Sequence, residues 1–197
     1  MIREFQLADW FTLANAACGM YALFSMMSYL ETGHVIHVYF ACGLVLAAFI
    51  FDVLDGSIAR WRKMTSVLGR ELDSLSDIIS FGVAPALIAF GCGMNGLIDR
   101  MILTGFVACC VSRLARFNVT AEALSMGQDK VKYFEGTPIP TSLLLVGVMF
   151  VAAIQDALGE GLWFGDVSLG GLTLHPLVLL FALSGALMVS RIRIPKI

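Results

Sequence analysis

The chain has 197 residues, of which 58% are hydrophobic and only 14% are charged, with a formal net charge of −2. Soluble domains average about 25% charged residues, so this composition and a mean hydropathy of +0.84 exclude an ordinary soluble domain. The sequence therefore predicts an integral membrane protein, in which the position of each charge matters more than the small net charge.

Six apolar runs follow one another along the chain. They cover residues 11–30, 35–51, 78–98, 101–112, 139–155 and 172–190, and they are continuous rather than alternating. A spanning helix needs about 20 residues, so the short fourth run must extend into its charged continuation, SRLARF. Only helices and closed barrels satisfy the backbone in hydrocarbon. We therefore predict an all-α integral membrane protein with six transmembrane helices in a single domain of residues 1–197.

The basic residues are distributed unequally between the two sides that a six-helix path creates. One side receives the N-terminus, the second and fourth loops and the C-terminus, with twelve of the thirteen Lys and Arg residues, whereas the other side receives only Arg100. Cytoplasmic segments carry such an excess of basic residues. We therefore expect both termini and the 59–70 loop on the cytoplasmic side of the inner membrane. The polar ends of the second, third and fourth helices should meet at that face.

Four carboxylates interrupt the apolar pattern near that face. Asp52 and Asp55 are three residues apart on one helix, and Gly69, Asp73 and Asp77 follow at spacings of four on the next, so each set shares a helix face. One Asp at the centre of a span costs roughly 2.5–3.5 kcal/mol on insertion scales, and mutual repulsion adds to that cost. Two hard divalent cations would neutralise the four groups and leave open positions for phosphate oxygens.

The residues between the two carboxylate pairs fit phosphate binding. Gly56 and Ala59 leave room for a nucleotide on the second helix. Arg60 can bind a phosphate through its guanidinium group, and Ser66 offers a hydroxyl in the following turn. Two other interpretations remain open from the residues alone. The carboxylates can line a cation or proton pathway in a transporter, or they can form structural ion pairs with Arg60, Arg62 and Arg70.

The spacing D-x2-D-G-x2-A-R-x8-G-x3-D-x3-D resembles the signature of the CDP-alcohol phosphotransferase family. All eight fixed positions match, namely Asp52, Asp55, Gly56, Ala59, Arg60, Gly69, Asp73 and Asp77. The resemblance implies a six-helix membrane enzyme, usually a homodimer, with two divalent metal ions (Mg or Mn, or Ca). Such an enzyme joins an alcohol to the phosphatidyl or related group of a CDP-linked donor and releases CMP.

The resemblance also implies a role for each matching residue. The metal ligands would be Asp52, Asp55, Asp73 and Asp77, and Asp77 would also be the catalytic base. The donor CDP-diacylglycerol would be contacted by a wider set, consisting of Asn15, Asp52, Gly56, Ala59, Arg60, Ser66 and Gly69. Asn15 belongs to this set through the TLAN stretch of the first helix.

Two further stretches resemble the subgroup of this family whose acceptor is L-serine. They are SRLARFN at residues 112–118 and FEGTPIP at residues 134–140. Free serine carries a carboxylate and an ammonium group that need partners. Arg113 and Arg116 lie three apart on one helix face and can hold the carboxylate, and Asn118 can add a hydrogen bond. Glu135 can bind the ammonium group.

These acceptor residues can also have roles that do not involve the substrate. The two arginines can anchor the helix near lipid headgroups, and Glu135 can be a solvated loop carboxylate. We expect CDP-diacylglycerol, L-serine and membrane lipid as partners, and no nucleic acid. Glycerol phosphate, inositol or inositol phosphate, and choline remain open as acceptors.

Overall fold

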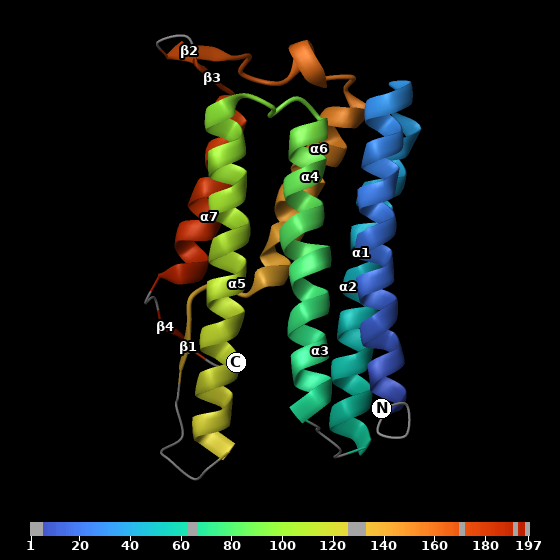
Figure 1. The fold of residues 1–197 in the computed structure, drawn as a ribbon, viewed down its shortest axis with the longest axis vertical. Coiled ribbons are helices and arrows are strands. Elements are labelled where there is room, and N and C mark those ends of the chain that lie inside the picture. The colour runs from blue at the N-terminus through green and yellow to red at the C-terminus, as the bar shows by residue number, and fades with distance from the viewer. Residues whose placement is uncertain (1–5, 63–66, 126–132, 170–171, 191–192, 196–197) are drawn as a thin grey trace.

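The computed structural model describes residues 6–62, 67–125, 133–169, 172–190 and 193–195. Within them, six helical segments run up and down as a bundle (Figure 1). The first two are α1 (Leu7–Thr32) and α2 (Ile36–Arg62), and the third combines α3 (Val67–Asp77), η2 (Ile78–Val83) and α4 (Ala84–Gly91). The last three are α5 (Leu97–Ser125), η3 (Ile139–Thr141) with α6 (Ser142–Ile154), and η5 (Pro176–Val178) with α7 (Leu179–Val189).

The helices extend beyond the apolar runs where the carboxylates required it. The second helix continues to Arg62 and the third begins at Val67, so Asp52, Asp55 and Asp73 lie on helices as predicted. The third helix ends at Gly91, before the end of the 78–98 apolar run. The chain turns there at Gly93, whose φ of 129° is open to glycine. As expected, the fourth helix runs through SRLARF, since α5 extends to Ser125.

Two short antiparallel pairs of strands were not expected. β1 (Tyr133–Glu135) pairs with β4 (Arg193–Pro195), and β2 (Val167–Leu169) pairs with β3 (Leu172–Leu174). A short 3-10 turn, η4 (Gly159–Gly161), precedes β2. The sixth apolar run therefore begins as a strand, and its helix starts only at Pro176, where the fixed φ of proline suits a first helical position.

The third helical segment changes its winding immediately after Asp77. η2 is a π-helical segment, a form that occurs mostly as short bulges and frequently at functional sites. Pro85 follows it and would crowd the carbonyl of residue 81 in a regular α-helix, which a wider turn relieves. The side chain of Ser80 in η2 donates to the Asn15 carbonyl oxygen at 2.9 Å, so α1 is fastened to this segment.

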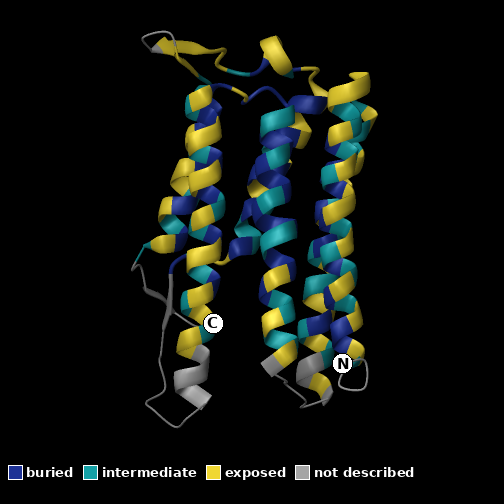
Figure 2. Cartoon of the chain, in the orientation of Figure 1, coloured by how far each residue is buried: buried dark blue, intermediate teal, exposed yellow. Residues whose placement is uncertain are grey.

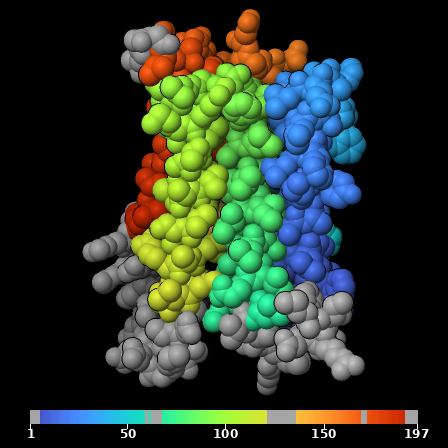
Figure 3. Space-filling model, viewed as in Figure 1, coloured from blue at the N-terminus to red at the C-terminus, as the bar shows by residue number. Residues whose placement is uncertain are grey.

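Buried and exposed residues alternate along the helices, so each helix has a face within the bundle and a face outside it (Figure 2). Phe106 and Phe181 meet edge to face in the core, with ring centroids 5.3 Å apart. Many large apolar side chains are exposed, including Tyr21, Phe40 and Met101. Two helices, Ile36–Ile58 and Leu68–Gly91, are long and apolar enough to cross a membrane. In space-filling view α1, α3–α4 and α5 lie side by side on one face (Figure 3).

The end of the bundle that carries β2 and β3 is fastened by a buried carboxylate. Asp99, which is fully buried, lies 2.6 Å from His175 Nδ1 and accepts hydrogen bonds from the His175 and Gly96 amides, both at 3.0 Å. These contacts join the start of α5 to the segment after β3. The sequence offered no signal for this pair, because the two side chains are 76 residues apart.

Candidate active site

Three of the four predicted carboxylates form a compact group between two neighbouring helices. Asp52 and Asp55 on α2 and Asp73 on α3 each offer an oxygen, and these oxygens all lie within 4.8 Å of one another. Asp55 is 5% exposed, so the group is turned into the bundle. The spacing of three on one helix and the antiparallel course of the next bring these residues together, as the sequence predicted.

Thr12 on α1 orients the cluster and was missed by sequence reasoning. Its hydroxyl donates to Asp55 Oδ2 at 2.7 Å, and both residues are buried. Thr12 lies three residues before Asn15, on the same face of α1. That spacing within an apolar run was the available signal, and it becomes meaningful only when the helix that α1 faces is known.

Asp77 lies one turn beyond Asp73 and has a different partner. The Asn15 side-chain amide donates to Asp77 Oδ1 at 3.2 Å, and both residues are buried. Asp77 is not part of the compact group of three. Because Ser80 holds the backbone of Asn15, α1 fixes the orientation of the Asp77 carboxylate.

The chemistry of the cluster fits a divalent cation. Asp73 Oδ1 and Asn15 Oδ1 are buried acceptor oxygens without a hydrogen-bond partner in the protein. Within the described residues no Lys or Arg side chain forms a salt bridge with a carboxylate, and Arg70 Nε has no hydrogen-bond partner, so Arg70 does not pair with the cluster. Oxygen acceptors without protein donors are the ligands that Mg²⁺ and Ca²⁺ take, which weighs against the structural ion-pair interpretation for Arg70.

Part of the predicted donor site lies outside the described residues. Gly56 and Gly69 are partly buried on α2 and α3, each beside the carboxylates of its own helix. Ser66 lies outside the described residues. Ala59 and Arg60 lie on α2, but their side chains are outside the described part. Their donor contacts therefore stay predictions.

Two of the predicted acceptor residues have partners within the protein. Asn118 on α5 donates to a Glu71 carboxylate oxygen at 3.3 Å and lies within hydrogen-bond distance of the Ser74 hydroxyl at 3.0 Å. Arg116 donates through Nη2 to the Met188 carbonyl oxygen at 3.4 Å. These contacts confirm that the polar end of α5 meets α3, and they add a contact with the end of α7.

Arg113 has no such partner for its Nε, which is buried and without a hydrogen bond in the protein. Its position follows from two contacts between the antiparallel helices. A Cβ on Gly82 would lie 3.5 Å from Cys110 Cβ, and Asn118 meets Ser74. Arg113 therefore lies between these levels, beside the start of η2 and close to Asp77. Glu135 belongs to β1, and its side chain lies outside the described part.

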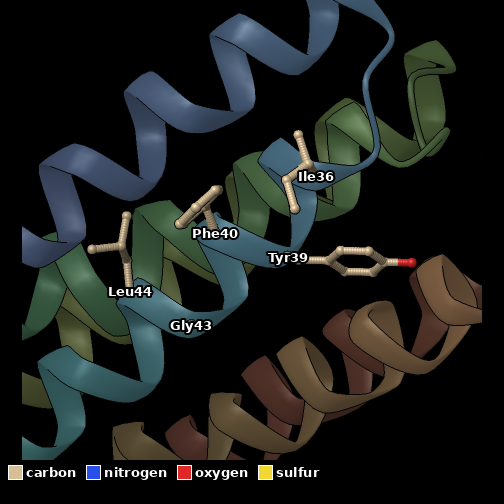
Figure 4. Close-up of a pocket in the computed structure, with 5 residues that line it drawn as sticks. All are labelled: Ile36, Tyr39, Phe40, Gly43 and Leu44. Atoms are coloured by element: carbon tan, nitrogen blue, oxygen red, sulfur yellow. The ribbon is translucent and has the colours of Figure 1, made fainter.

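A hollow elsewhere on the molecule has no comparable chemistry. It is lined by residues of the first half of α2, namely Ile36, Tyr39, Phe40, Gly43 and Leu44 (Figure 4). The Tyr39 hydroxyl is already bonded to the Ala153 carbonyl oxygen at 3.1 Å. Leu44 precedes Asp52 by eight residues, or about 12 Å of helix. The hollow is thus an apolar surface feature, and the candidate active site remains at the aspartates.

Comparison with known proteins assigns the chain to a family, and the matched residues include this site. The model for the family described as CDP-alcohol phosphatidyltransferase matches residues 5–188, which include the whole cluster and Arg113. This chain belongs to that family. It is 41% identical over 205 residues to CDP-diacylglycerol–serine O-phosphatidyltransferase of Saccharomyces cerevisiae, a match that covers all of this chain and 72% of that protein.

Two other relatives are similar over different lengths. The Helicobacter pylori (strain 26695) protein of the same name is 38% identical over 188 residues, covering 94% of this chain and 70% of its own. Archaetidylserine synthase of Methanothermobacter thermautotrophicus is 36% identical over 121 residues, covering 60% of this chain and 49% of its own. The family assignment thus rests on a match that extends along nearly the whole bundle.

Proposed function

We propose that this CDP-alcohol phosphatidyltransferase moves the phosphatidyl group of CDP-diacylglycerol onto the hydroxyl of L-serine, giving phosphatidylserine and CMP. The observation that carries the proposal is the group formed by Asp52, Asp55 and Asp73, next to the Asn15–Asp77 pair. The names of the yeast, bacterial and archaeal relatives differ in the lipid but agree on a seryl product. That agreement favours serine over the other acceptors and over a transporter.

The carboxylates would hold two divalent cations, Mg²⁺ or Mn²⁺ with Ca²⁺ as the other choice, which when bound would neutralise the donor's pyrophosphate and polarise its phosphorus. Asp52, Asp55 and Asp73 supply the compact set of oxygens, and Asp77 is proposed as the further ligand. Thr12 keeps one oxygen of Asp55 in a fixed orientation. Arg60 and Ser66 are proposed to contact the CDP part, together with Gly56, Ala59 and Gly69.

The reacting groups can be followed atom by atom. The serine hydroxyl oxygen forms a bond to the phosphorus on the diacylglycerol side of the donor. The bond between that phosphorus and the oxygen leading to CMP breaks, and CMP keeps the electron pair. The serine proton passes to Asp77, which needs to lie within hydrogen-bond reach of it. Asn15 occupies one oxygen of Asp77, so the other oxygen is available for the proton.

The membrane placement is part of the proposal. We propose a homodimer in the inner membrane whose active site and both termini face the cytoplasm, with residues 1–197 as one domain. The exposed apolar side chains along α1, α2 and α5 support burial in lipid, since soluble proteins rarely expose so large an apolar surface. The donor would enter sideways from the cytoplasmic leaflet, where its acyl chains can lie against these helices.

A single cysteine at position 63 tests the orientation in a background without the five native cysteines. In intact cells, a membrane-impermeant thiol reagent should leave this cysteine unlabelled, and permeabilisation should expose it. A control cysteine at position 34, in the turn between α1 and α2, should already be labelled in intact cells. Labelling of position 63 in intact cells would refute the proposed topology.

An acceptor panel tests the function. The purified chain receives CDP-diacylglycerol in mixed micelles with L-serine, glycerol 3-phosphate, inositol or choline, and both CMP and the lipid product are measured. We expect serine to give by far the fastest CMP release, with phosphatidylserine as the product. Faster release with another alcohol would refute the serine assignment. Cation flux in proteoliposomes without any CMP release would instead indicate a transporter.

A further inference from the structure

Several buried polar atoms outside the carboxylate group have no hydrogen-bond partner in the protein. They are Arg70 Nε, Arg113 Nε, Thr137 Oγ1 and Ser142 Oγ. A buried polar group left unpaired costs free energy, so such atoms mark places where a ligand or an ordered water completes the structure. Thr137 is the one in the segment that joins β1 to η3.

The end of α7 places Thr137 and Arg113 at the same level of the bundle. The Met188 sulfur lies 3.6 Å from Cys110 Sγ, and the Met188 carbonyl accepts from Arg116, so Met188 lies beside the stretch of α5 that contains Arg113. The Thr137 amide donates to the carbonyl oxygen of Leu187, the residue before Met188, at 3.4 Å. Both unpaired groups therefore lie around the end of α7.

Gly136 makes this close docking of the segment possible. Its φ is +78°, in the left-handed region, and a Cβ at this position would collide with the Met188 carbonyl oxygen. The turn at Gly136 fixes where the next residue, Thr137, begins. The same segment leads into η3, which packs against η2, the segment directly after Asp77. Thr137 thus lies between the end of α7 and a segment that packs against η2.

The other two unpaired atoms belong to different places. Ser142 opens α6, whose next turn contacts α2, where Cys42 Sγ lies 4.0 Å from the Val146 carbonyl oxygen. Ser142 is fully buried at the start of α6. Arg70 precedes Asp73 on α3 and lies toward the turn between α2 and α3. Within the described residues neither of them forms a hydrogen bond to the end of α7, as Thr137 and Arg116 do.

We propose that Thr137 is a specificity-determining residue whose hydroxyl, together with the Arg113 guanidinium, holds the carboxylate of the acceptor amino acid. The inference rests on the proposed function and refines its acceptor site. A carboxylate offers two acceptor oxygens, and these two residues supply unpaired donors of complementary kind. Arg116 and Asn118 then act as positioning residues, because their polar groups are bonded to Met188 and to Glu71 and Ser74.

The test compares three variants of the full chain in the micellar assay. Thr137→Val removes the hydroxyl at nearly constant volume, Thr137→Ser retains it, and Thr104→Val is the matched control. The Thr104 hydroxyl is exposed and bonded within its own helix to the Arg100 carbonyl oxygen. Thr137→Val should raise the KM for serine roughly 10- to 100-fold, the range for one hydrogen bond to a charged group. The KM for CDP-diacylglycerol should change less than about 2-fold.

Thr137→Ser should restore most of the affinity for serine, and Thr104→Val should behave as the wild type. A second arm uses Arg113→Gln alone and combined with Thr137→Val. If both residues grip one carboxylate, the combined loss should be smaller than the product of the separate losses. Serine methyl ester lacks the carboxylate, so the wild type should have a higher KM for it than for serine. In both single variants the two KM values should become similar.

Failure of this inference differs from failure of the proposed function. An unchanged serine KM in Thr137→Val would overturn the inference while serine remained the acceptor of the wild type. Equal losses for serine and for the lipid donor, unrelieved in Thr137→Ser, would also overturn it, since they indicate a packing role. A wild-type enzyme that prefers another alcohol would overturn the proposed function, and the inference with it.

Discussion

Gly19→Ala should damage both the stability and the turnover of the enzyme. A Cβ at Gly19 on α1 would lie 2.5 Å from Ser80 Oγ and 2.9 Å from Ser80 Cα. The second atom is backbone, so η2 would have to retreat by about 0.5 Å to reach the 3.4 Å of ordinary contact. Overpacking of this kind costs about 1–3 kcal/mol of unfolding free energy.

The same retreat would disturb catalysis through two hydrogen bonds. Ser80 holds the Asn15 carbonyl, and the Asn15 side chain holds Asp77, the proposed base. A displacement of about 1 Å can cost on the order of 100-fold in rate, so a shift of half that size should lower kcat roughly 10-fold. The KM for CDP-diacylglycerol should change little, because Asp52, Asp55 and Asp73 keep their places.

Thermal unfolding in detergent and steady-state CMP release measure the two effects. Gly105→Ala on α5 is the matched control, because a Cβ there would meet nothing within 4 Å. In a helix this control should be neutral or stabilising by up to about 1 kcal/mol. If Gly19→Ala matched Gly105→Ala in both stability and kcat, the close approach of α1 and η2 would have no role in positioning Asp77.

Three further predictions follow from the active site and from the opposite end of the bundle. Excess chelator, and separately Asp73→Ala, should abolish CMP release, and added Mg²⁺ or Mn²⁺ should rescue only the chelated wild type; full activity after chelation and dialysis would contradict the metal proposal. Asp77→Asn should lower turnover roughly 100- to 10,000-fold with donor affinity largely retained, and a loss no larger than that in donor or metal affinity would make Asp77 a ligand alone. His175→Ala should lower the unfolding free energy by about 1.5–3 kcal/mol, because Asp99 loses one hydrogen bond to its buried carboxylate. The exposed His34→Ala should not do so, and an equal melting temperature for these two variants would refute the role of the Asp99 contact.

The carboxylate cluster could be predicted from the sequence because helix periodicity relates residues that are close in the chain. Asp52 and Asp55 share a face at a spacing of three, and the antiparallel course of α3 brings Asp73 against them. The length of α5 was equally predictable, since a short apolar run needs its charged continuation to span. Both inferences use local spacing and one global constraint.

Contacts between helices distant in the chain could not be obtained in the same way. Asn118 was expected at the acceptor, yet its amide is bonded to Glu71 and lies beside Ser74, because the packing of α5 on α3 decides which polar groups are already occupied. The His175–Asp99 pair depends on the fold of β2 and β3, which are strands of three residues each, too short for a periodic signal. Propensity and pattern do not specify such pairings.

The role of the first helix in the site is the hardest to predict from its apolar sequence. Thr12, Asn15 and Gly19 follow at spacings of three and four, so they form one stripe on α1 that faces both α2 and α3–η2. Each member of the stripe acts on a different part of the site. Thr12 orients Asp55, Asn15 orients Asp77, and Gly19 sets how closely the helix approaches η2. Because the carboxylates themselves lie on α2 and α3, a small rotation of α1 would move the partners of a proposed metal ligand and of the proposed base together. The geometry of the reaction thus depends on a helix that carries neither the metal cluster nor the family signature.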